Sequence, residues 1–178
     1  MTERTAVTTE TISKNVRQAF EFQQKTTVWI GIGRTSPWPN EENVPDPPRT
    51  TQAIGEILGL VKPLPLKMVV PADDGEIEMF AQKFHALPMP YDINTLITDG
   101  ARWVYVSAWL MYDEFPVAAY RQEGVYSGVV PDASVPPGAT ILLPGQVASY
   151  GLLEAVTNRR KIQRRADQKE FIEFILEF

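Results

Sequence analysis

The feature that most limits how this chain can fold is a cluster of prolines directly after a short β-rich run at residues 26–34. Five of the twelve residues from Pro37 to Pro48 are proline. Each proline fixes its φ angle and removes a backbone donor, so this segment can form neither a helix nor an inner strand. We therefore expect a stiff, proline-rich loop over residues 34–49.

The run before the loop predicts a β-strand with one clear core face. Val28, Ile30 and Ile32 occupy every second position, which puts three β-branched side chains on one face of an extended strand. Gly31 and Gly33 lack a Cβ atom, so another backbone or side chain can approach closely where the strand ends. The strand is expected to lead directly into the stiff loop.

Two side chains make this loop a candidate interaction site. Arg34 leaves the strand, and its guanidinium fork can bind loop carbonyls or the carboxylates of Glu41, Glu42 or Asp46. Trp38 is large and apolar, so its indole either folds back onto its own domain or is offered to a partner. The residues of the candidate structural or interface loop are Gly31, Gly33, Arg34, Pro37 and Trp38.

The Gly-X-Gly-Arg-Thr-Ser sequence at residues 31–36 also invites comparison with a phosphate-binding loop. A dinucleotide fingerprint needs a third glycine that opens a helix, and a Walker loop needs Gly-Lys-Ser/Thr before one. Here Ser-Pro-Trp-Pro follows, which opens no helix. A structural turn is therefore favoured over a nucleotide site.

The composition favours one domain over residues 1–178 and limits its chemistry. The chain is 44% hydrophobic, enough for one substantial core, and its polar residues 1–8 are expected to form a mobile arm. It has no cysteine, which excludes disulfides and thiolate sites and fits folding in a reducing cytoplasm. No apolar run approaches about 18 residues and no signal-peptide pattern opens the chain, so no membrane partner is expected.

Charge is spread unevenly along the chain. The net charge of −5 argues against nucleic acid as a partner. Residues 158–169 nevertheless hold six basic residues and one acid, a charge of +5 that leaves −10 for the remainder. This basic stretch is either a solvated face or an electrostatic surface that orients a neighbouring protein. The candidate basic interface consists of Arg159, Arg160, Lys161, Arg164 and Arg165.

The order of the elements predicts an α+β fold, mainly an antiparallel sheet or sandwich, with two helices in the N-terminal half. An apolar stripe predicts an amphipathic helix over residues 9–24. Thr50 or Thr51 can cap a second helix that ends near Val61.

The rest of the chain predicts strands. Single strands are expected at Leu66–Val70 and, buried on nearly both faces, at Arg102–Tyr112. Two hairpins are expected as well, one from segments 115–121 and 125–130 and the other from segments 150–163 and 169–178.

The ionisable residues suggest no catalytic, cofactor or metal site. Asp73, Asp74, Glu76 and Glu78 cluster in the sequence, but their spacing does not match an EF-hand and favours a solvated acidic turn. His85 is the only histidine, so a hydrogen-bonded structural imidazole is favoured over a metal ligand.

Three segments together resemble a known family. Gly33–Trp38 with the following Asn/Glu-rich stretch and prolines resembles the signature of the baseplate wedge proteins of contractile-tailed, T-even-like bacteriophages. Val61–Pro65 leading to Pro71 resembles the segment that follows in that family, and Glu173–Phe178 resembles its apolar chain end. The chain is similar to a short form that lacks the inserted domain of the founding member.

This resemblance implies a function. It implies a structural virion protein, not an enzyme, that links neighbouring subunits of a tail baseplate and is assembled in the host cytoplasm. The implied partners are other baseplate wedge proteins, with a homodimer as a further implication. A tail-associated glycan hydrolase with a carboxylate pair and a small-ligand-binding module at the Gly-Arg loop are the alternatives.

Overall fold

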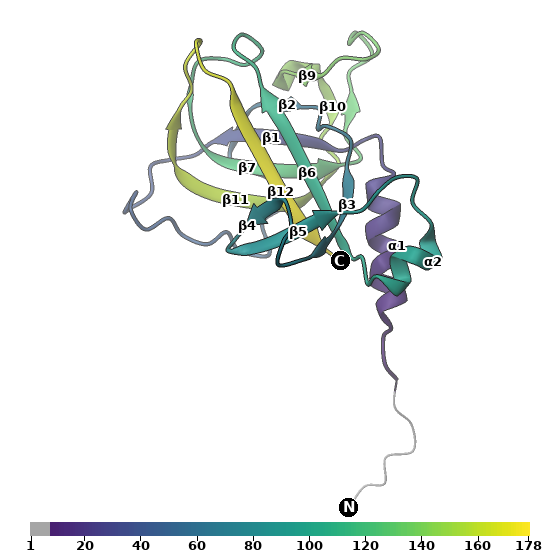
Figure 1. Cartoon of the computed structure of the whole chain (residues 1–178). Coiled ribbons are helices and arrows are strands. Elements are labelled where there is room, and N and C mark those ends of the chain that lie inside the picture. Colours follow the sequence, from purple (N-terminus) through teal and green to yellow (C-terminus); the bar gives the residue numbers. More distant parts are fainter. Residues whose placement is uncertain (1–7) are drawn as a thin grey trace, which may run out of the picture. The chain divides into compact units, whose positions relative to one another are not determined.

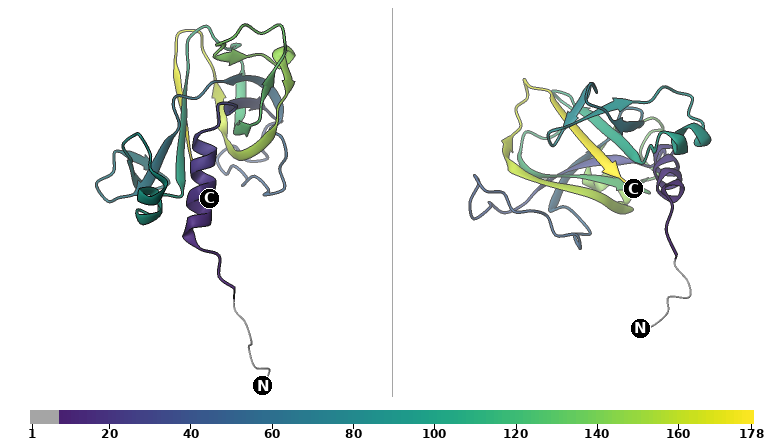
Figure 2. Two further views of the ribbon diagram at one scale, coloured as in Figure 1. Left: turned by 90° about the vertical axis from the view of Figure 1, so that its right-hand side faces the viewer. Right: turned by 60° about the horizontal axis from the view of Figure 1, so that its bottom comes forward.

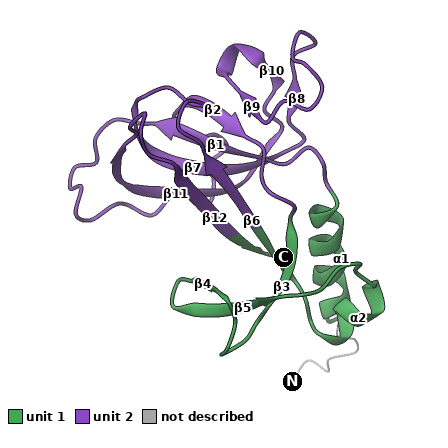
Figure 3. Cartoon of the chain, turned by 45° about the horizontal axis from the view of Figure 1, so that its top comes forward, with its two compact units in different colours: residues 1–24, 66–105, 175–178 green, residues 25–65, 106–174 purple. Residues whose placement is uncertain are grey.

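The computed structural model describes residues 8–178, which form two compact units (Figure 3). The first unit contains the described residues up to Gln24, together with Leu66–Tyr105 and Ile175–Phe178. The second unit contains Lys25–Pro65 and Val106–Phe174. The expected mobile arm lies outside the described residues apart from Thr8, which is exposed. A single domain over the whole chain stays a prediction.

The second unit is built around a five-stranded sheet with the order β11-β7-β1-β2-β9 (Figure 1). All four pairings in it are antiparallel. The strand bounds are β1 Trp29–Arg34, β2 Glu56–Val61, β7 Ala119–Ser127, β9 Ile141–Leu142 and β11 Leu152–Gln163. The same unit holds a two-stranded sheet and a 3-10 turn, with the bounds β8 Val130–Pro131, β10 Val147–Ser149 and η1 Pro144–Gln146.

Strand β1 is central in this sheet and is buried on both faces. The predicted strand is confirmed, but Trp29, on the face opposite Ile30 and Ile32, is also only 4% exposed. Gly31 leaves room for neighbours, because a Cβ atom there would lie 3.1 Å from Leu60 Cδ2 and from a Tyr126 ring carbon. The prediction of one core face was therefore incomplete. Both faces are buried, because the glycines let side chains pack against the second face of the strand as well.

The second sheet has the order β12-β6-β3-β5-β4, and its strands β6 and β12 have residues in both units. The first unit also contains two helices, α1 and α2, which lie side by side (Figure 2). The bounds are α1 Ile12–Gln23, β3 Lys67–Pro71, β4 Ile77–Met79, β5 Gln82–Ala86, α2 Ile93–Thr98, β6 Trp103–Leu110 and β12 Glu170–Glu177. This arrangement confirms the α+β class with mostly antiparallel strands.

Local periodicity predicted several of these elements correctly. The amphipathic helix is confirmed as α1, which buries Val16, Ala19 and Phe22. The strands expected at 66–70 and 102–112 are confirmed as β3 and β6. Helix α2 was not predicted, and Asp92 caps its N-terminus, because the Asp92 carboxylate accepts a hydrogen bond from Thr95 N at 2.9 Å.

The second predicted helix is wrong, because its residues form strand β2. Gly59 pairs with Ile32 of β1, and a Cβ atom at Gly59 would lie 2.5 Å from a ring carbon of Phe115. Gly55 and Gly59 each lower helix propensity by roughly 1 kcal/mol relative to alanine. The apolar residues that fit a helix face are used instead in a buried strand beside β1.

The hairpin predicted within residues 115–130 is also wrong. Strand β7 runs without a turn through Gly124, which lies opposite Gly31 of β1. A Cβ atom at Gly124 would lie 2.8 Å from Leu153 Cδ1. This glycine therefore serves close packing between strands rather than a reversal of the chain.

The last predicted hairpin is half right. Strands β11 and β12 exist, but β11 pairs with β7, whereas β12 neighbours β6 in the other sheet. The chain changes sheet at Arg164, whose backbone N donates to Ala118 O at 3.1 Å and whose Nη2 donates to Met111 O at 2.5 Å. These bonds fix the segment between β11 and β12, so the two strands do not form a hairpin with each other.

Candidate interaction surface

Residues 35–49 of the proline-rich loop contain neither helix nor strand, connect β1 to β2, and extend from the sheet in Figure 1. Its middle is a turn in which Asn43 N donates to Asn40 O at 3.2 Å. Asn40 Oδ1 also accepts from Glu42 N at 2.9 Å, an Asx turn that is typical of asparagine. The Asn40 turn therefore restricts the loop in addition to its prolines.

Trp38 attaches the loop to strand β11. Its indole Nε1 donates to the backbone oxygen of Arg159 at 2.8 Å, and the side chain is half-buried. Of the two expectations for this indole, the structure shows folding back onto its own unit, while part of the ring stays accessible.

Glu41 makes a second attachment. Its Oε1 accepts from Arg121 Nε at 2.8 Å, and its Oε2 accepts from the backbone N of Lys161 at 3.3 Å. Desolvation raises the pKa of Glu41, but the hydrogen bonds from Arg121, Lys161 and Trp38 outweigh it and hold the pKa below its usual value. Glu41 is therefore bound here as a carboxylate.

These attachments cover an irregular part of an edge strand. The pairing of β11 with β7 shifts register between Asn158 and Ile162, which leaves residues 159–161 bulged. The loop reaches this edge through Trp38 and Glu41, and Asn158 Nδ2 donates to Pro45 O at 2.9 Å. Unpaired edge backbone is a site of unwanted strand pairing, so a loop that satisfies it protects the sheet.

The structure thus brings together two candidates that lie more than 100 residues apart in the sequence. We use the name loop–β11 surface for residues 34–49 together with residues 158–161. Arg160 completes it through an ion pair with Glu42 at 2.6 Å, in which both side chains are largely exposed.

The remaining basic candidates differ in exposure. Arg159 forms an ion pair with the buried Glu123. Lys161 and Arg165 are exposed, whereas Arg164 is 1% exposed and its Nε and Nη1 atoms have no hydrogen-bond partner among the described residues. The basic stretch therefore divides into residues that hold the fold together and residues that face solvent.

The expected partners of Arg34 were wrong. Its Nε and Nη2 donate to the two oxygens of Glu56 at 2.9 and 2.5 Å, an exposed bidentate pair between β1 and β2. The hydrogen bond and charge of Glu56 raise the pKa of Arg34. The loop carboxylate is held instead by Arg121 of β7, which sequence reasoning missed because strand pairing, not local spacing, brings it there.

A buried polar network lies beneath this surface and was also missed. Glu123 is 4% exposed, and Tyr120 OH donates to Glu170 Oε2 at 2.7 Å. Burial raises the pKa of Glu123, although its ion pair with Arg159 opposes the shift. Burial, with the nearby Glu123 and Glu170, also raises the pKa of the Tyr120 hydroxyl.

A groove of about 410 Å³ continues the loop–β11 surface along β11. Its walls come from the end of the proline-rich loop and the first half of β11, and its lining residues are Pro47, Pro48, Arg49, Thr51, Leu153, Glu154, Ala155 and Val156. Arg49 is exposed there. The mixed lining of prolines, aliphatic side chains, one cation and the carboxylate of Glu154 suits a polypeptide more than a small polar substrate.

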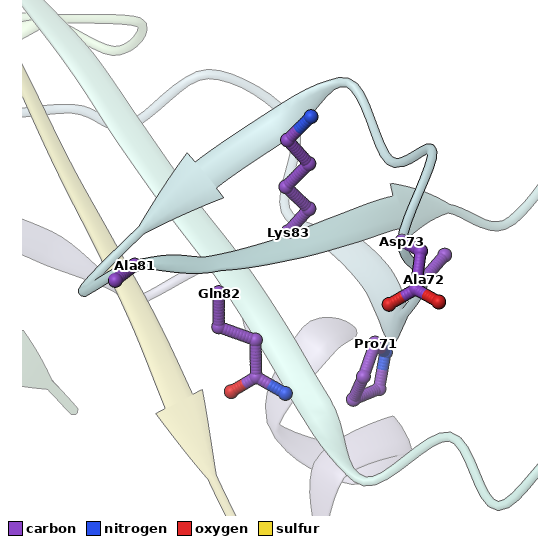
Figure 4. A pocket seen from close by; sticks show the side chains of 6 residues that line it. All are labelled: Pro71, Ala72, Asp73, Ala81, Gln82 and Lys83. Atoms are coloured by element: carbon purple, nitrogen blue, oxygen red, sulfur yellow. The ribbon is translucent and has the colours of Figure 1, made fainter.

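A separate hollow of about 450 Å³ lies in the first unit beside the β4–β5 hairpin (Figure 4). Asp73 and Lys83 supply its only charged side chains among Pro71, Ala72, Asp73, Ala81, Gln82 and Lys83. A glycoside hydrolase of the usual kind needs two carboxyl groups across the bond, and this lining offers one.

The acidic turn and the histidine agree with their structural interpretation. Gly75 N donates to Ala72 O at 3.1 Å, which closes the turn. Glu76 accepts from the backbone N of Ala86 and contacts His85 Nδ1, both at 2.9 Å, so the hydrogen-bonded imidazole is confirmed. Within residues 8–178 there is no cluster of three or more acidic or histidine side chains that could hold a metal ion. No helix in that range is long and apolar enough to span a bilayer.

Comparison with known proteins identifies the family. Residues 7–178 match the sequence profile of a family described as "Baseplate wedge 3 tail fiber network component". The chain belongs to this family. It is also 31% identical to "Virion protein 3" of Enterococcus phage phiEF24C over 147 residues. This match covers 79% of this chain and 78% of that protein. The resemblance to baseplate wedge proteins is thereby confirmed, and the family is one of structural phage baseplate proteins.

Proposed function

We propose that this chain is a structural component of the baseplate wedge in a contractile phage tail, where it links neighbouring baseplate subunits. Membership of the wedge family supports the location in the virion baseplate. The observation that supports the linking role is the loop–β11 surface, in which the proline-rich loop and the basic stretch are joined by direct hydrogen bonds. The absence of cysteine fits assembly in the host cytoplasm.

The surface is suited to this role because it is already ordered in one chain. Prolines and the bonds of Trp38 and Glu41 restrict the loop before any partner binds. A pre-organised loop loses less conformational entropy on association, so more of the contact energy appears as affinity. The exposed Lys161 and Arg165 add positive charge that can orient a partner during encounter.

The partners proposed are other baseplate wedge proteins, and a homodimer is a second arrangement for the same surface. Light scattering on the purified chain distinguishes the two. A monomer in solution that is nevertheless present in baseplates supports contacts with other proteins, whereas a dimer supports pairing between copies. No specific observation favours the hydrolase or the small-ligand module.

Incorporation into particles tests the linking role. A phage that lacks the chain is supplied with the wild-type protein, with Trp38→Ala, or with Val130→Ser as a control. Val130 is 51% exposed in the same unit and outside the loop–β11 surface. Purified baseplates are expected to contain the wild-type and control chains and much less of the Trp38→Ala chain. Equal amounts of all three would remove the surface from the proposal, and absence of the wild-type chain would overturn the baseplate role itself.

A further inference from the structure

The tip of the β4–β5 hairpin has an unusual backbone. Met79 pairs with Gln82, so Phe80 and Ala81 alone form the turn. Their φ angles are 52° and 61°, and they are the only described residues other than glycine with positive φ. A two-residue turn with positive φ at both positions is a type I′ turn, which strongly favours Asn-Gly. Phenylalanine and alanine both carry a Cβ atom that disfavours this conformation.

The tip also presents an aromatic ring to solvent. Phe80 is 86% exposed, more than any other large hydrophobic residue in the part of the chain that the structure describes. Its position on the turn keeps it away from the nearby core cluster of Val69, Phe84 and Tyr105. Neither the turn nor the packing of this unit is stabilised by a phenylalanine at this position, which makes the ring a candidate contact with another molecule.

The charges around the tip indicate what kind of molecule would accept it. Residues 72–86 contain four carboxylates and one lysine, a net charge of −3 with the histidine neutral. Glu78 lies opposite Lys83 in the strand register, so one negative and one positive residue face each other there, and the acids at residues 73–76 make up the net negative charge. A complementary surface is apolar at its centre and basic at its rim.

Two other acceptors fit these charges less well. A second copy offers the groove along β11 and a small apolar hollow in the 87–99 segment, but both have carboxylates in their lining that would repel an acidic hairpin, namely Glu154 in the groove and Asp92 and Asp99 in the hollow. An anionic lipid surface would repel the same carboxylates.

We propose that Phe80 is a docking knob that inserts into an apolar pocket rimmed by Lys or Arg on a different protein of the baseplate. This inference rests on the proposed baseplate role for the setting, but it uses residues outside the loop–β11 surface. The strained turn holds the ring away from its own core and ready for the partner. The contact is therefore a second, independent attachment point of the chain.

Site-specific photo-cross-linking in assembled particles tests the partner. A benzophenone amino acid replaces Phe80 in the full chain, and the same amino acid at Met89, 64% exposed in the same unit, is the control. The expected product at position 80 joins a different baseplate protein at a peptide that contains Lys or Arg, and position 89 does not give it. A product with a second copy, a product with lipid, equal products at both positions or no product at position 80 would each overturn the proposal.

Competition for incorporation tests the energy of the contact. Wild-type and variant chains are supplied in equal amounts, and mass spectrometry measures their ratio in purified baseplates. Phe80→Ser is expected to be under-represented about tenfold, as for a buried aromatic anchor. The double variant F80N/A81G, which has the preferred turn sequence, is expected to be equally depleted although its hairpin is more stable. A ratio near one for both variants, with the wild-type chain present in baseplates, overturns the knob and leaves the baseplate role intact.

Discussion

The loop–β11 surface and the Phe80 hairpin are both exposed, but they are built in opposite ways. In the first, Trp38 and Glu41 are held by hydrogen bonds to strand β11 and to Arg121. In the second, Phe80 has almost all of its surface exposed on a turn that disfavours it. Changes in the first surface should therefore alter the stability of the fold as well as assembly. Removal of the ring at the hairpin tip should alter assembly alone.

The largest effect on stability is expected from Arg159→Ala. Arg159 belongs to the loop–β11 surface and pairs with Glu123 beneath it, so its loss leaves Glu123 buried without a cation. Breaking a buried ion pair from one side typically costs 3–5 kcal/mol, and the partial exposure of Arg159 reduces this to about 2–3 kcal/mol. Denaturant unfolding measures the change.

The double variant E123Q/R159A is the matched control for this prediction. It removes the uncompensated charge, and we expect it to regain much of the lost stability. If R159A alone unfolds like the wild-type chain, the loop–β11 surface does not depend on the buried network.

A smaller effect is expected from Trp38→Ala. The half-buried indole loses its packing and its hydrogen bond to Arg159 O, which together contribute about 1–2 kcal/mol. Trp38→Phe retains most of the packing and removes the donor, so the loss from the wild-type chain to Trp38→Phe isolates the hydrogen bond, and the further loss in Trp38→Ala isolates the packing. Thermal melting of the isolated protein checks both. A wild-type melting temperature for Trp38→Ala would show that the loop is not held by its indole.

The two carboxylates of this region predict opposite dependences on pH. Since the folded pKa of Glu41 is lowered, its contribution is present above the ordinary carboxyl pKa and is lost as the pH falls through the folded value. The raised pKa of Glu123 acts in reverse, because stability falls as the pH rises from the ordinary value through the raised one.

Glu41→Gln should therefore make unfolding less sensitive to acid, below about pH 4. The free energy of unfolding, measured as a function of pH for both chains, checks this. Parallel curves for the wild-type and variant chains would contradict the bonds assigned to Glu41.

The same contrast explains which parts of the molecule the sequence could predict. Helix α1, strand β1 and the proline-rich loop follow from residues close together in the chain, so periodicity and proline chemistry were sufficient. The loop's partners were not accessible in this way, because Arg121 and Arg159 meet it only through strand pairing.

The predictions for two glycines were wrong for the same reason. Gly59 and Gly124 were interpreted as part of a helix and of a turn, yet both allow close packing between strands that only the folded sheet defines. The Phe80 turn gave no signal, since Phe-Ala is not a sequence that favours a type I′ turn.

The smallest effect on stability is expected from Phe80→Ser, which provides the sharpest contrast with Trp38→Ala. The ring is 86% exposed, so its removal uncovers no cavity and leaves no buried group without a partner. Exposed substitutions of this kind usually change stability by no more than about 0.5 kcal/mol. Serine keeps a Cβ atom at the positive-φ position, so the strain of the turn is retained and the comparison isolates the ring. Thermal melting measures the change, and a loss as large as that of Trp38→Ala would mean that Phe80 packs within its own unit and is no knob.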